Sequence, residues 1–250
     1  MKTDVIQRLI QINTVFYQNF GPAFAATRRR IQPGIRRVLE EIPKHGRWLD
    51  LGCGSGALAL EWAGQGRTGV YTGLDFSASL LEEARQGLLG VAHPGLEINF
   101  LPANLGDPNW PAGLSGQTFD GVLAFASLHH IPGDELRLSI LRQTRALLPA
   151  GGLFFHSEWQ FQNSPRLLAR VLPWQAAGLD PAELDEGDTL LDWRFALPGQ
   201  AERVGRRYVH RFERAELARL AFESGFEIVD EFDSDGEGGR LGLYQLWRAA

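Results

Sequence analysis

Residues 49–56, with the sequence LDLGCGSG, contain three glycines whose spacing could let a small ligand lie against the backbone. Gly52, Gly54 and Gly56 follow the pattern G-x-G-x-G, and glycine permits a sharp turn and a close approach because it has no Cβ atom. The pattern differs from the G-x-G-x-x-G of most dinucleotide-binding loops and from the phosphate-binding loop of nucleoside triphosphatases. Taken alone, it is also compatible with an ordinary tight turn between a strand and a helix.

Polar residues at the ends of the predicted strands could recognise an adenosine-like ligand. Asp75 lies 19 residues after Gly56, where its carboxylate can accept hydrogen bonds from both ribose hydroxyls, although an Asp here can also cap the following helix. Asp50 could orient the glycine loop, meet a ligand ammonium, or be a solvated turn residue. Asn104 and Leu105 could contact the edge and the face of an adenine, although an Asn in a loop is ordinarily a turn residue.

Alternating apolar runs and helical patterns predict the elements that would position these residues. From about residue 47 the pattern is that of β-α-β units, which form a parallel sheet. The predicted strands are residues 47–52, 70–75, 96–101, 119–126 and 152–158. The predicted helices are residues 3–20, 31–42, 56–64, 77–89, 134–148 and 213–224. Two last strands, at 226–232 and 241–248, are joined by a Gly-rich turn, which predicts a hairpin and an antiparallel edge.

We expect a single domain over residues 1–250, divided into four parts. They are a helical cap at 1–45, a cofactor-binding core at 46–158, an insertion at 159–205, and a closing helix and hairpin at 206–250. The insertion has no clear hydrophobic period and contains four prolines and three tryptophans. A segment of this kind inside a compact domain is more often a lid or a substrate-binding segment than a linker.

Composition limits the class of protein. Of the 250 residues, 44% are hydrophobic, which is enough for a substantial core. The net charge is −5, with +6 on residues 1–47 and −11 on the remainder. Cys53 is the only cysteine, which excludes a disulfide framework and a cysteine-based zinc site, and no metal is expected. Because no stretch has the length and hydropathy of a signal peptide or a membrane span, we expect a cytoplasmic protein without membrane contact.

Five segments in a fixed order resemble the class I S-adenosylmethionine-dependent methyltransferases. They are LDLGCGSG, GLDFS, PANL, FDGVLAFASLHHI and LLPAGGLFF, within about residues 45–158. The resemblance implies a Rossmann-like α/β fold, with a seven-stranded, mostly parallel sheet, an antiparallel last strand and helices on both faces. It implies S-adenosyl-L-methionine as cofactor, over the carboxyl ends of the first strands. The cofactor-binding residues that follow are Tyr17, Arg28, Asp50, Gly52, Cys53, Gly54, Gly56, Asp75, Phe76, Asn104, Leu105 and Ala126.

The flanks of this core resemble a narrower family, the eukaryotic tRNA wobble-uridine carboxymethyl methyltransferases. Residues 16–30, FYQNFGPAFAATRRR, are similar to its Y-N-x-x-A-x-x-F-x-x-T-R segment, and residues 207–220, RYVHRFERAELARL, to its R-Y-Y-H-x-[FY]-x-x-x-E-L segment. The matching positions are Tyr17, Phe24, Thr27, Arg28, Arg207, Tyr208, His210, Glu216 and Leu217. Two positions depart from the patterns: Val209 replaces an aromatic residue, and Gln18 stands before Asn19.

This resemblance implies a carboxymethyl group on a modified tRNA uridine as the methyl acceptor, and a small zinc-binding activator protein as a partner. A carboxylate is ionised at neutral pH, so it needs no general base. Arginine side chains can hold a carboxylate bidentately, and Arg28 and Arg207 are the expected pair. We expect a partial engagement, because a full clamp would reduce the nucleophilicity of the carboxylate.

A hydroxyl or amine acceptor would instead need a base, for which His129 and His130 are the candidates. They follow the fourth predicted strand, and we expect only one of them to face the site because adjacent side chains point in different directions. This alternative is a small-molecule or natural-product methyltransferase. A third alternative is a non-catalytic interaction module, against which the intact glycines and Asp75 argue.

Arginines cluster on both sides of the insertion in sequence. Together they could form a basic rim that binds phosphates in a salt-dependent way, or they could lie on solvated helix faces. They are Arg28, Arg29, Arg30, Arg36, Arg37, Arg203, Arg206, Arg207, Arg211 and Arg214.

Overall fold

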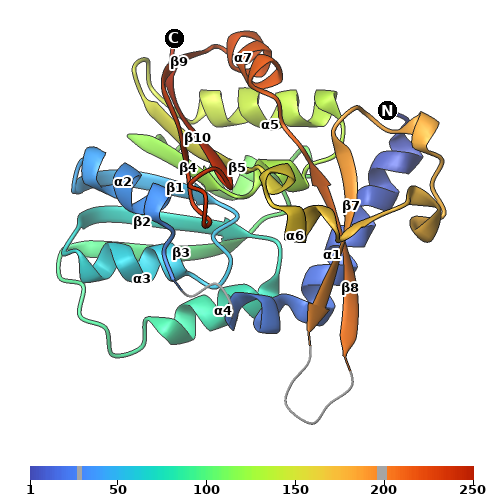
Figure 1. Ribbon diagram of the computed structural model, residues 1–250. Helices are drawn as coiled ribbons and strands as arrows, with labels where there is room; N and C mark the ends of the chain where they lie inside the picture. The colour runs from blue at the N-terminus through green and yellow to red at the C-terminus, as the bar shows by residue number, and fades with distance from the viewer. Residues whose placement is uncertain (27–29, 196–201) are drawn as a thin grey trace.

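The computed structural model describes residues 1–26, 30–195 and 202–250, apart from the side chains of residues 22 and 24–26. Within these residues, seven strands form one sheet in the order β3-β2-β1-β4-β5-β10-β9 (Figure 1). They are β1 (His45–Leu51), β2 (Thr68–Asp75), β3 (Leu96–Pro102), β4 (Gly121–Phe125), β5 (Leu153–Trp159), β9 (Phe226–Ser234) and β10 (Gly242–Ala249). Strands β1 to β5 are parallel, and β10 is antiparallel to both β5 and β9.

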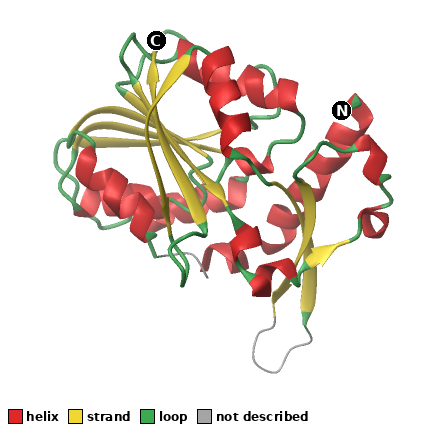
Figure 2. Ribbon diagram, turned by 45° about the horizontal axis from the view of Figure 1, so that its top comes forward, coloured by secondary structure: helices red, strands yellow, loops and turns green. Residues whose placement is uncertain are grey.

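Helices cover both faces of this sheet, as Figure 2 shows. Helices α2 (Pro33–Glu41), α3 (Ala57–Gly64) and α4 (Ala78–Gly87) pack on one face, and α5 (Asp134–Ala146) and α7 (Arg214–Glu223) on the other. Successive strand residues point to opposite faces, so Phe154 belongs to the α5 and α7 core and Phe155 to the α2 to α4 core. The expected Rossmann-like α/β fold is therefore confirmed, and these elements agree with their predicted bounds within two residues.

The expected final hairpin is present, but its position in the sheet is more specific than the sequence indicates. Strand β10 inserts between β5 and β9, so the edge of the sheet is β9 and not the last strand of the chain. Side chains on β10 are buried at most positions. On β9, buried or partly buried side chains alternate with exposed ones.

The expected insertion contains a second sheet that the sequence analysis missed. It has the order β6-β7-β8, with β6 (Val171–Leu172), β7 (Asp188–Phe195) and β8 (Arg203–His210), all antiparallel. Strand β8 crosses the expected boundary at residue 205, so the insertion and the segment after it form one unit. Short helical elements complete the chain: α6 (Pro165–Leu168) and the 3-10 helices Trp110–Leu114, Leu128–His130, Phe161–Asn163, Trp174–Ala177 and Pro181–Glu183.

Helix α1 (Thr3–Ala26) runs beside β7 and β8 and is longer than the predicted helix at 3–20 (Figure 1). It continues through Gly21 and Pro22, where the sequence predicts a break. Gly21 lies against Leu80 of α4, so the helix remains packed on the core beyond the predicted end at residue 20.

A buried polar network attaches the three-stranded sheet to α5 and α7. The Tyr208 hydroxyl donates to Asp188 Oδ1 at 2.7 Å, and His210 lies between Asp188 (2.8 Å) and Glu216 (3.0 Å). Arg137 Nη1 lies 3.2 Å from Glu216 Oε1. Burial lowers the pKa of His210, but hydrogen bonds to Asp188 and Glu216 outweigh burial, so the net shift is upward. His210 therefore joins β7 of the three-stranded sheet to α7.

Candidate functional site

A cavity of about 600 Å³ opens at the carboxyl ends of β1, β2, β4 and β5. The strand order reverses between β1 and β4, which is where open α/β sheets bind ligands. Two sets of residues in this lining meet where the rings of Tyr17 and Phe76 lie edge to face, with centroids 5.8 Å apart. The glycine-loop wall consists of Asp50, Gly52, Gly54, Asp75 and Phe76. The Arg207 wall consists of Tyr17, His129, His130, Trp159 and Arg207.

The three glycines of the loop have different structural roles, although all three have positive φ angles. A Cβ atom on Gly52 would overlap Ser127 Oγ, and one on Gly56 would lie 2.8 Å from Ala84 Cβ. Around Gly54, by contrast, a Cβ would meet no described atom within 4 Å. Gly52 and Gly56 thus allow the loop to pack on its neighbours, whereas Gly54 leaves space beside the backbone on the cavity side.

Asp75 fixes the glycine loop to the start of α4. Its Oδ2 accepts the backbone N–H of Gly54 at 3.0 Å, and its Oδ1 accepts that of Ser77 at 2.8 Å. Burial raises the pKa of Asp75, and these N–H groups oppose that shift. Ser77 is itself the N-cap, through its bond from Leu80 N. Each carboxylate oxygen keeps a second lone pair, so this structural role leaves Asp75 able to accept further hydrogen bonds.

Asp50 is buried, which excludes the interpretation of it as a solvated turn residue. It accepts a hydrogen bond from the Tyr71 hydroxyl. Burial is the main cause that raises the pKa of Asp50 to about 7, with a smaller contribution from the charge of Asp75. Asp50 is therefore close to half-ionised at neutral pH, and a cation in the cavity would favour its charged form.

Both adjacent histidines line the cavity, contrary to the expectation that only one would. Strand β4 ends at Phe125, and His129 and His130 lie on the 3-10 helix Leu128–His130, where neighbouring side chains do not alternate between two faces. Their ring centroids are 4.4 Å apart. His130 Nε2 lies 3.0 Å from the Tyr17 hydroxyl, and its Nδ1 lies 3.1 Å from the Tyr208 carbonyl oxygen.

Arg207 brings a positive charge into the cavity lining. It is only 4% exposed, and its guanidinium carbon lies 5.2 Å from the ring centroids of both Phe16 and Trp159. This stacking between α1 and the end of β5 fixes the planar cation. The second expected clamp residue, Arg28, lies outside the described residues, as do Thr27 and the side chain of Phe24.

Of the other predicted cofactor residues, Cys53, Asn104, Leu105 and Ala126 line the cavity, whereas Gly56 does not. Asn104 Oδ1 accepts from Gly106 N at 3.0 Å, so it does form the turn that was the alternative interpretation. Ala126 has a φ of 54°, which is uncommon for a residue with a Cβ, and its N–H donates to Ser157 O at 3.1 Å. Such a backbone conformation is often found beside functional sites.

Several lining residues were missed by the sequence analysis. They are Asn13, Ser157, Glu158, Trp159, Arg166, Asp235 and Tyr244. Arg30, which the sequence offered as a member of the possible basic rim, also lines the cavity. The predicted strand at 152–158 ends with Ser157 and Glu158, and Trp159 follows it. Because this strand end lies at the same edge of the sheet as Asp50 and Asp75, its position could have identified these three residues. Tyr244 donates to Asp235 Oδ2 at 2.6 Å at the β9–β10 turn, and nothing in the local sequence indicates that this turn reaches the cavity.

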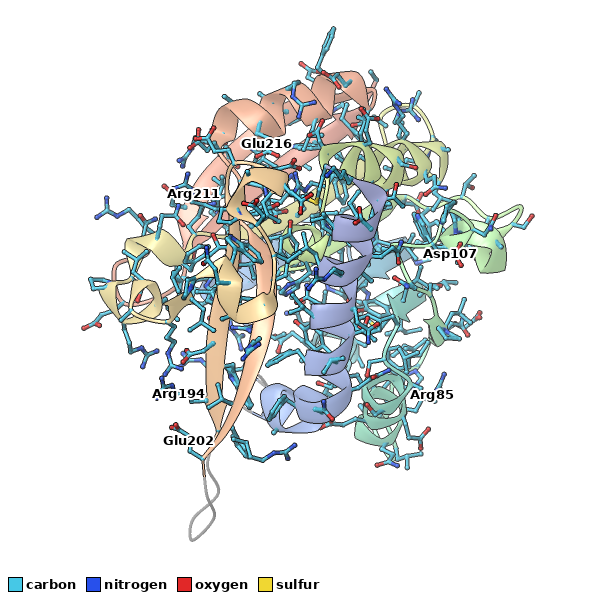
Figure 3. All side chains as sticks on the ribbon, turned by 90° about the vertical axis from the view of Figure 1, so that its right-hand side faces the viewer. Arg85, Asp107, Arg194, Glu202, Arg211 and Glu216 are labelled. Atoms are coloured by element: carbon cyan, nitrogen blue, oxygen red, sulfur yellow. The ribbon has the colours of Figure 1, made fainter. Side chains whose placement is uncertain are left out.

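Four described members of the possible basic rim lie in ion pairs with carboxylates, which offsets part of their positive charge. Arg36 lies 3.4 Å from Glu61, Arg37 lies 3.2 Å from Asp230, Arg211 lies 3.3 Å from Glu213 and Arg214 lies 2.9 Å from Asp233. Arg194 and Glu202 also pair at 3.5 Å, and Figure 3 shows them at the opposite end of the three-stranded sheet from Arg211. Arg28 and Arg29 lie outside the described residues.

Two further findings concern sites of other kinds. In the described ranges, no group of three or more His, Cys, Asp or Glu side chains is arranged to hold a metal ion. None of the helices in the part of the chain that the structure describes has the length and hydropathy needed to cross a membrane.

Comparisons with known proteins identify the family. The chain matches the family model of a methyltransferase domain over residues 24–231. A protein of Encephalitozoon cuniculi named as a methyltransferase is 28% identical over 221 residues, covering 86% of this chain and 87% of that protein. A methyltransferase structure from Methanosarcina mazei has a TM-score of 0.62 at 22% identity, covering 88% of this chain and 98% of that one, and it shows the fold.

Two other relatives match shorter regions. A ubiquinone biosynthesis O-methyltransferase of Vibrio vulnificus is 35% identical over 109 residues, which are 44% of this chain and 42% of that protein. A tRNA methyltransferase 9B of Mus musculus is 25% identical over 165 residues, which are 64% of this chain and 33% of that protein. The chain thus spans less than half the length of either relative. Because the family model covers most of its length, the chain belongs to the class I S-adenosyl-L-methionine-dependent methyltransferases.

Proposed function

We propose that this methyltransferase methylates a carboxylate, and that the acceptor is the carboxymethyl group of a modified tRNA uridine. The observation that carries the proposal is the buried guanidinium of Arg207 in the cavity lining. A buried cation attracts an anion more strongly than an exposed one because water screens it less, and Arg binds carboxylates with particular geometric fit. A carboxylate acceptor matches both the charge and the shape of this group when it enters the cavity.

The residues of the glycine-loop wall fit the cofactor. The space beside Gly54 admits a ligand, and both oxygens of Asp75 can accept from ribose hydroxyls. Asp50 would meet the amino group of the methionine part, which favours the ionised carboxylate. When bound, S-adenosyl-L-methionine would supply a methyl group attached to a positively charged sulfur. In one step, a carboxylate oxygen would bond to the methyl carbon and the bond from that carbon to the sulfur would break.

The Arg207 wall would bind and orient the acceptor. Arg207 holds the carboxylate while Trp159 and Tyr17 shape the space around it. Alignment of donor and acceptor in a cavity that excludes water is itself a large part of the catalysis in such a displacement. No proton has to be removed from the acceptor, because a carboxylate is ionised at neutral pH.

The tRNA part of the proposal is supported by two observations. The mouse relative named as a tRNA methyltransferase matches 64% of this chain. The segments around Tyr17 and Arg207, which resemble the tRNA wobble-uridine family, both contribute side chains to the cavity. We also propose a cytoplasmic location, in which the buried, free thiol of Cys53 would stay reduced.

A small-molecule acceptor is the second candidate, and the paired arginines favour it. With Arg36, Arg37, Arg211 and Arg214 in ion pairs, the described surface offers fewer cations for phosphates than the sequence suggested. The 35% identity to a ubiquinone biosynthesis O-methyltransferase over 109 residues points in the same direction. A hydroxyl acceptor would require one of the two histidines to act as a base.

Transfer of a radiolabelled methyl group tests the proposal. The purified protein is given labelled S-adenosyl-L-methionine with total tRNA or with a small-molecule extract from the same cells. We expect label on tRNA that mild alkali releases as methanol, because only an ester is hydrolysed in this way. Alkali-stable label, or label confined to the small-molecule fraction, would contradict the tRNA carboxymethyl assignment.

A further inference from the structure

One face of the β7–β8 hairpin continues outward from the cavity. In this hairpin Trp193 pairs with Gly205, and Phe195 pairs with Arg203. Side chains alternate along a strand, so Arg203 lies on the same face as Arg207, and Trp193 and Phe195 lie on that face as well. Figure 1 shows β7 and β8 running side by side past α1, so this face leads away from the cavity that Arg207 lines.

Two phenylalanines of α1 lie against this face. The guanidinium carbon of Arg207 is 5.2 Å from the ring centroid of Phe16, and that of Arg203 is 4.7 Å from the ring centroid of Phe20. Trp193 contacts both rings, with centroid distances of 5.6 Å to Phe16 and 5.3 Å to Phe20. Because Phe16 and Phe20 are about one helical turn apart, cations and aromatic rings follow one another along the hairpin.

The outer end of this face carries a parallel pair of aromatic rings. The ring centroids of Trp193 and Phe195 are 5.4 Å apart, with an angle of 6° between the ring planes. Phe195 is the last described residue of β7, and it is partly exposed. A flat ring of this kind is a surface on which any nucleobase can stack, since every base has a π-face.

Arg203 is an exposed cation whose charge is not offset by its sequence neighbour Glu202. Glu202 pairs instead with Arg194 on the other face of the hairpin, at 3.5 Å. Among the residues that the structure describes, Arg203 has no ion pair, whereas Arg211 at the other end of the sheet is paired with a carboxylate (Figure 3). The guanidinium of Arg203 therefore suits an anion such as a phosphate.

We propose that Trp193, Phe195 and Arg203 form a hairpin platform that binds single-stranded RNA beside the cavity. The base of a nucleotide next to the modified uridine stacks on Phe195, and a backbone phosphate binds Arg203. The inference rests on the proposed function and deepens it by naming residues that distinguish a tRNA acceptor from a free nucleoside. Arg203 and Arg207 are about 13 Å apart along β8, so an acceptor carboxylate and a phosphate outside the cavity can bind the same face.

Binding of a labelled oligouridylate tests the hairpin platform without methyl transfer. The probe has about eight nucleotides, which is within the usual range of single-strand sites. Phe195→Leu keeps apolar bulk but removes the flat ring, so its Kd by fluorescence anisotropy should rise by about 5- to 30-fold. Phe195→Tyr keeps the ring and should bind within about twofold of the wild type. Val204→Ala, at a 53% exposed position on the other face, is the control.

The salt dependence of the same binding tests Arg203. Each phosphate contact to a single strand contributes about 0.7 to the slope of log Kd against log salt, so Arg203→Ala should reduce the slope by about 0.7. Arg194→Ala removes a cation from the other face of the same hairpin and should leave the slope unchanged. A wild type that does not bind the probe, or equal changes in slope for both variants, would overturn the inference.

Two acceptors separate the hairpin platform from the proposed function. For tRNA, kcat/KM should fall by about 5- to 30-fold in Phe195→Leu, whereas the free carboxymethyl nucleoside should be used as well as by the wild type. Thermal unfolding and affinity for S-adenosylhomocysteine show that each variant is folded. If the variants methylate tRNA like the wild type, the hairpin platform is overturned and the proposed function stands. If they weaken probe binding as expected but the wild type forms no ester on tRNA, only the proposed function fails.

Discussion

The glycine-loop wall and the Arg207 wall line the same cavity but are built in different ways. The glycine-loop wall comes from consecutive strand, loop and helix segments, so each part of it lies close to the others in sequence. The Arg207 wall is assembled from α1, the 3-10 helix Leu128–His130, the end of β5 and β8. Because the Arg207 wall is built from distant segments, it depends on the tertiary contacts that hold the three-stranded sheet in place. The difference in construction between the two walls predicts how each wall responds to substitution.

The largest effect is expected from Asp75→Ala on the glycine-loop wall. The variant loses the bonds from Gly54 and Ser77 together with the proposed bonds to the ribose. Each hydrogen bond to a charged group contributes about 1.5 to 3 kcal/mol, so the Kd for the cofactor should rise by about 100-fold or more. Calorimetric titration measures this Kd. The matched control is Asp107→Ala, which removes a carboxylate on an exposed loop. Retained affinity would remove the ribose assignment.

Arg207→Ala should give the next largest effect. This effect should be on the use of the methyl acceptor and not on the binding of the cofactor. We expect kcat/KM for the acceptor to fall by about 30- to 100-fold, because a charge-assisted hydrogen bond is lost, while cofactor affinity changes by less than about twofold. Steady-state kinetics with the acceptor varied, and titration of the cofactor, measure the two quantities. Arg211→Ala, which removes a partly buried arginine paired with Glu213, is the control. An equal loss of both quantities would assign Arg207 a purely structural role.

The affinity for the cofactor should depend on pH through Asp50. The pKa of Asp50 is about 7 because the group is buried. Below this value the free protein carries a protonated Asp50, and binding a cationic ligand must release that proton. Affinity should therefore be about tenfold weaker at pH 6 than at pH 8, since one proton is released per ligand. Asp50→Asn should abolish this dependence, and an unchanged pH dependence in the variant would reject the role of Asp50.

The smallest expected effect concerns the attachment of the Arg207 wall. Because hydrogen bonds to Asp188 and Glu216 outweigh burial and raise the pKa of His210 in the folded state, its contribution to stability is complete below about pH 6.5 and is lost as pH rises through the folded-state pKa. Thermal unfolding should show a loss of up to about 4 °C between pH 6 and pH 9 relative to His210→Gln. A constant difference between wild type and variant across this range would show that His210 does not titrate there.

The two walls also differ in how much of them could be predicted from the sequence. Gly52, Gly54 and Asp75 could be identified because a strand, a glycine loop and a carboxylate at the end of the next strand form a local pattern. The position of Arg207 was found only through a resemblance, and β7 was missed because its buried face includes Asp192, whose charge is paired with Arg170 and Arg194. A buried acid interrupts the apolar alternation that indicates a strand.

Local geometry explains the other differences. His129 and His130 were expected to point apart because they were placed after a strand, whereas a 3-10 helix brings both rings to the cavity. Ion pairs across β9 and α7 neutralise arginines such as Arg214, and no linear pattern of charges predicts such pairing. These features depend on which segments meet in space, which tertiary packing decides.

Titration of S-adenosylhomocysteine against four proteins tests the separation of the two walls most directly. The proteins are the wild type, Asp75→Ala, Arg207→Ala and the double variant. If the walls act independently, Arg207→Ala should leave the Kd within about twofold in both backgrounds, whereas Asp75→Ala raises it by about 100-fold in both. A loss of affinity in Arg207→Ala comparable to that in Asp75→Ala would contradict the account, because the two walls would then form a single binding unit.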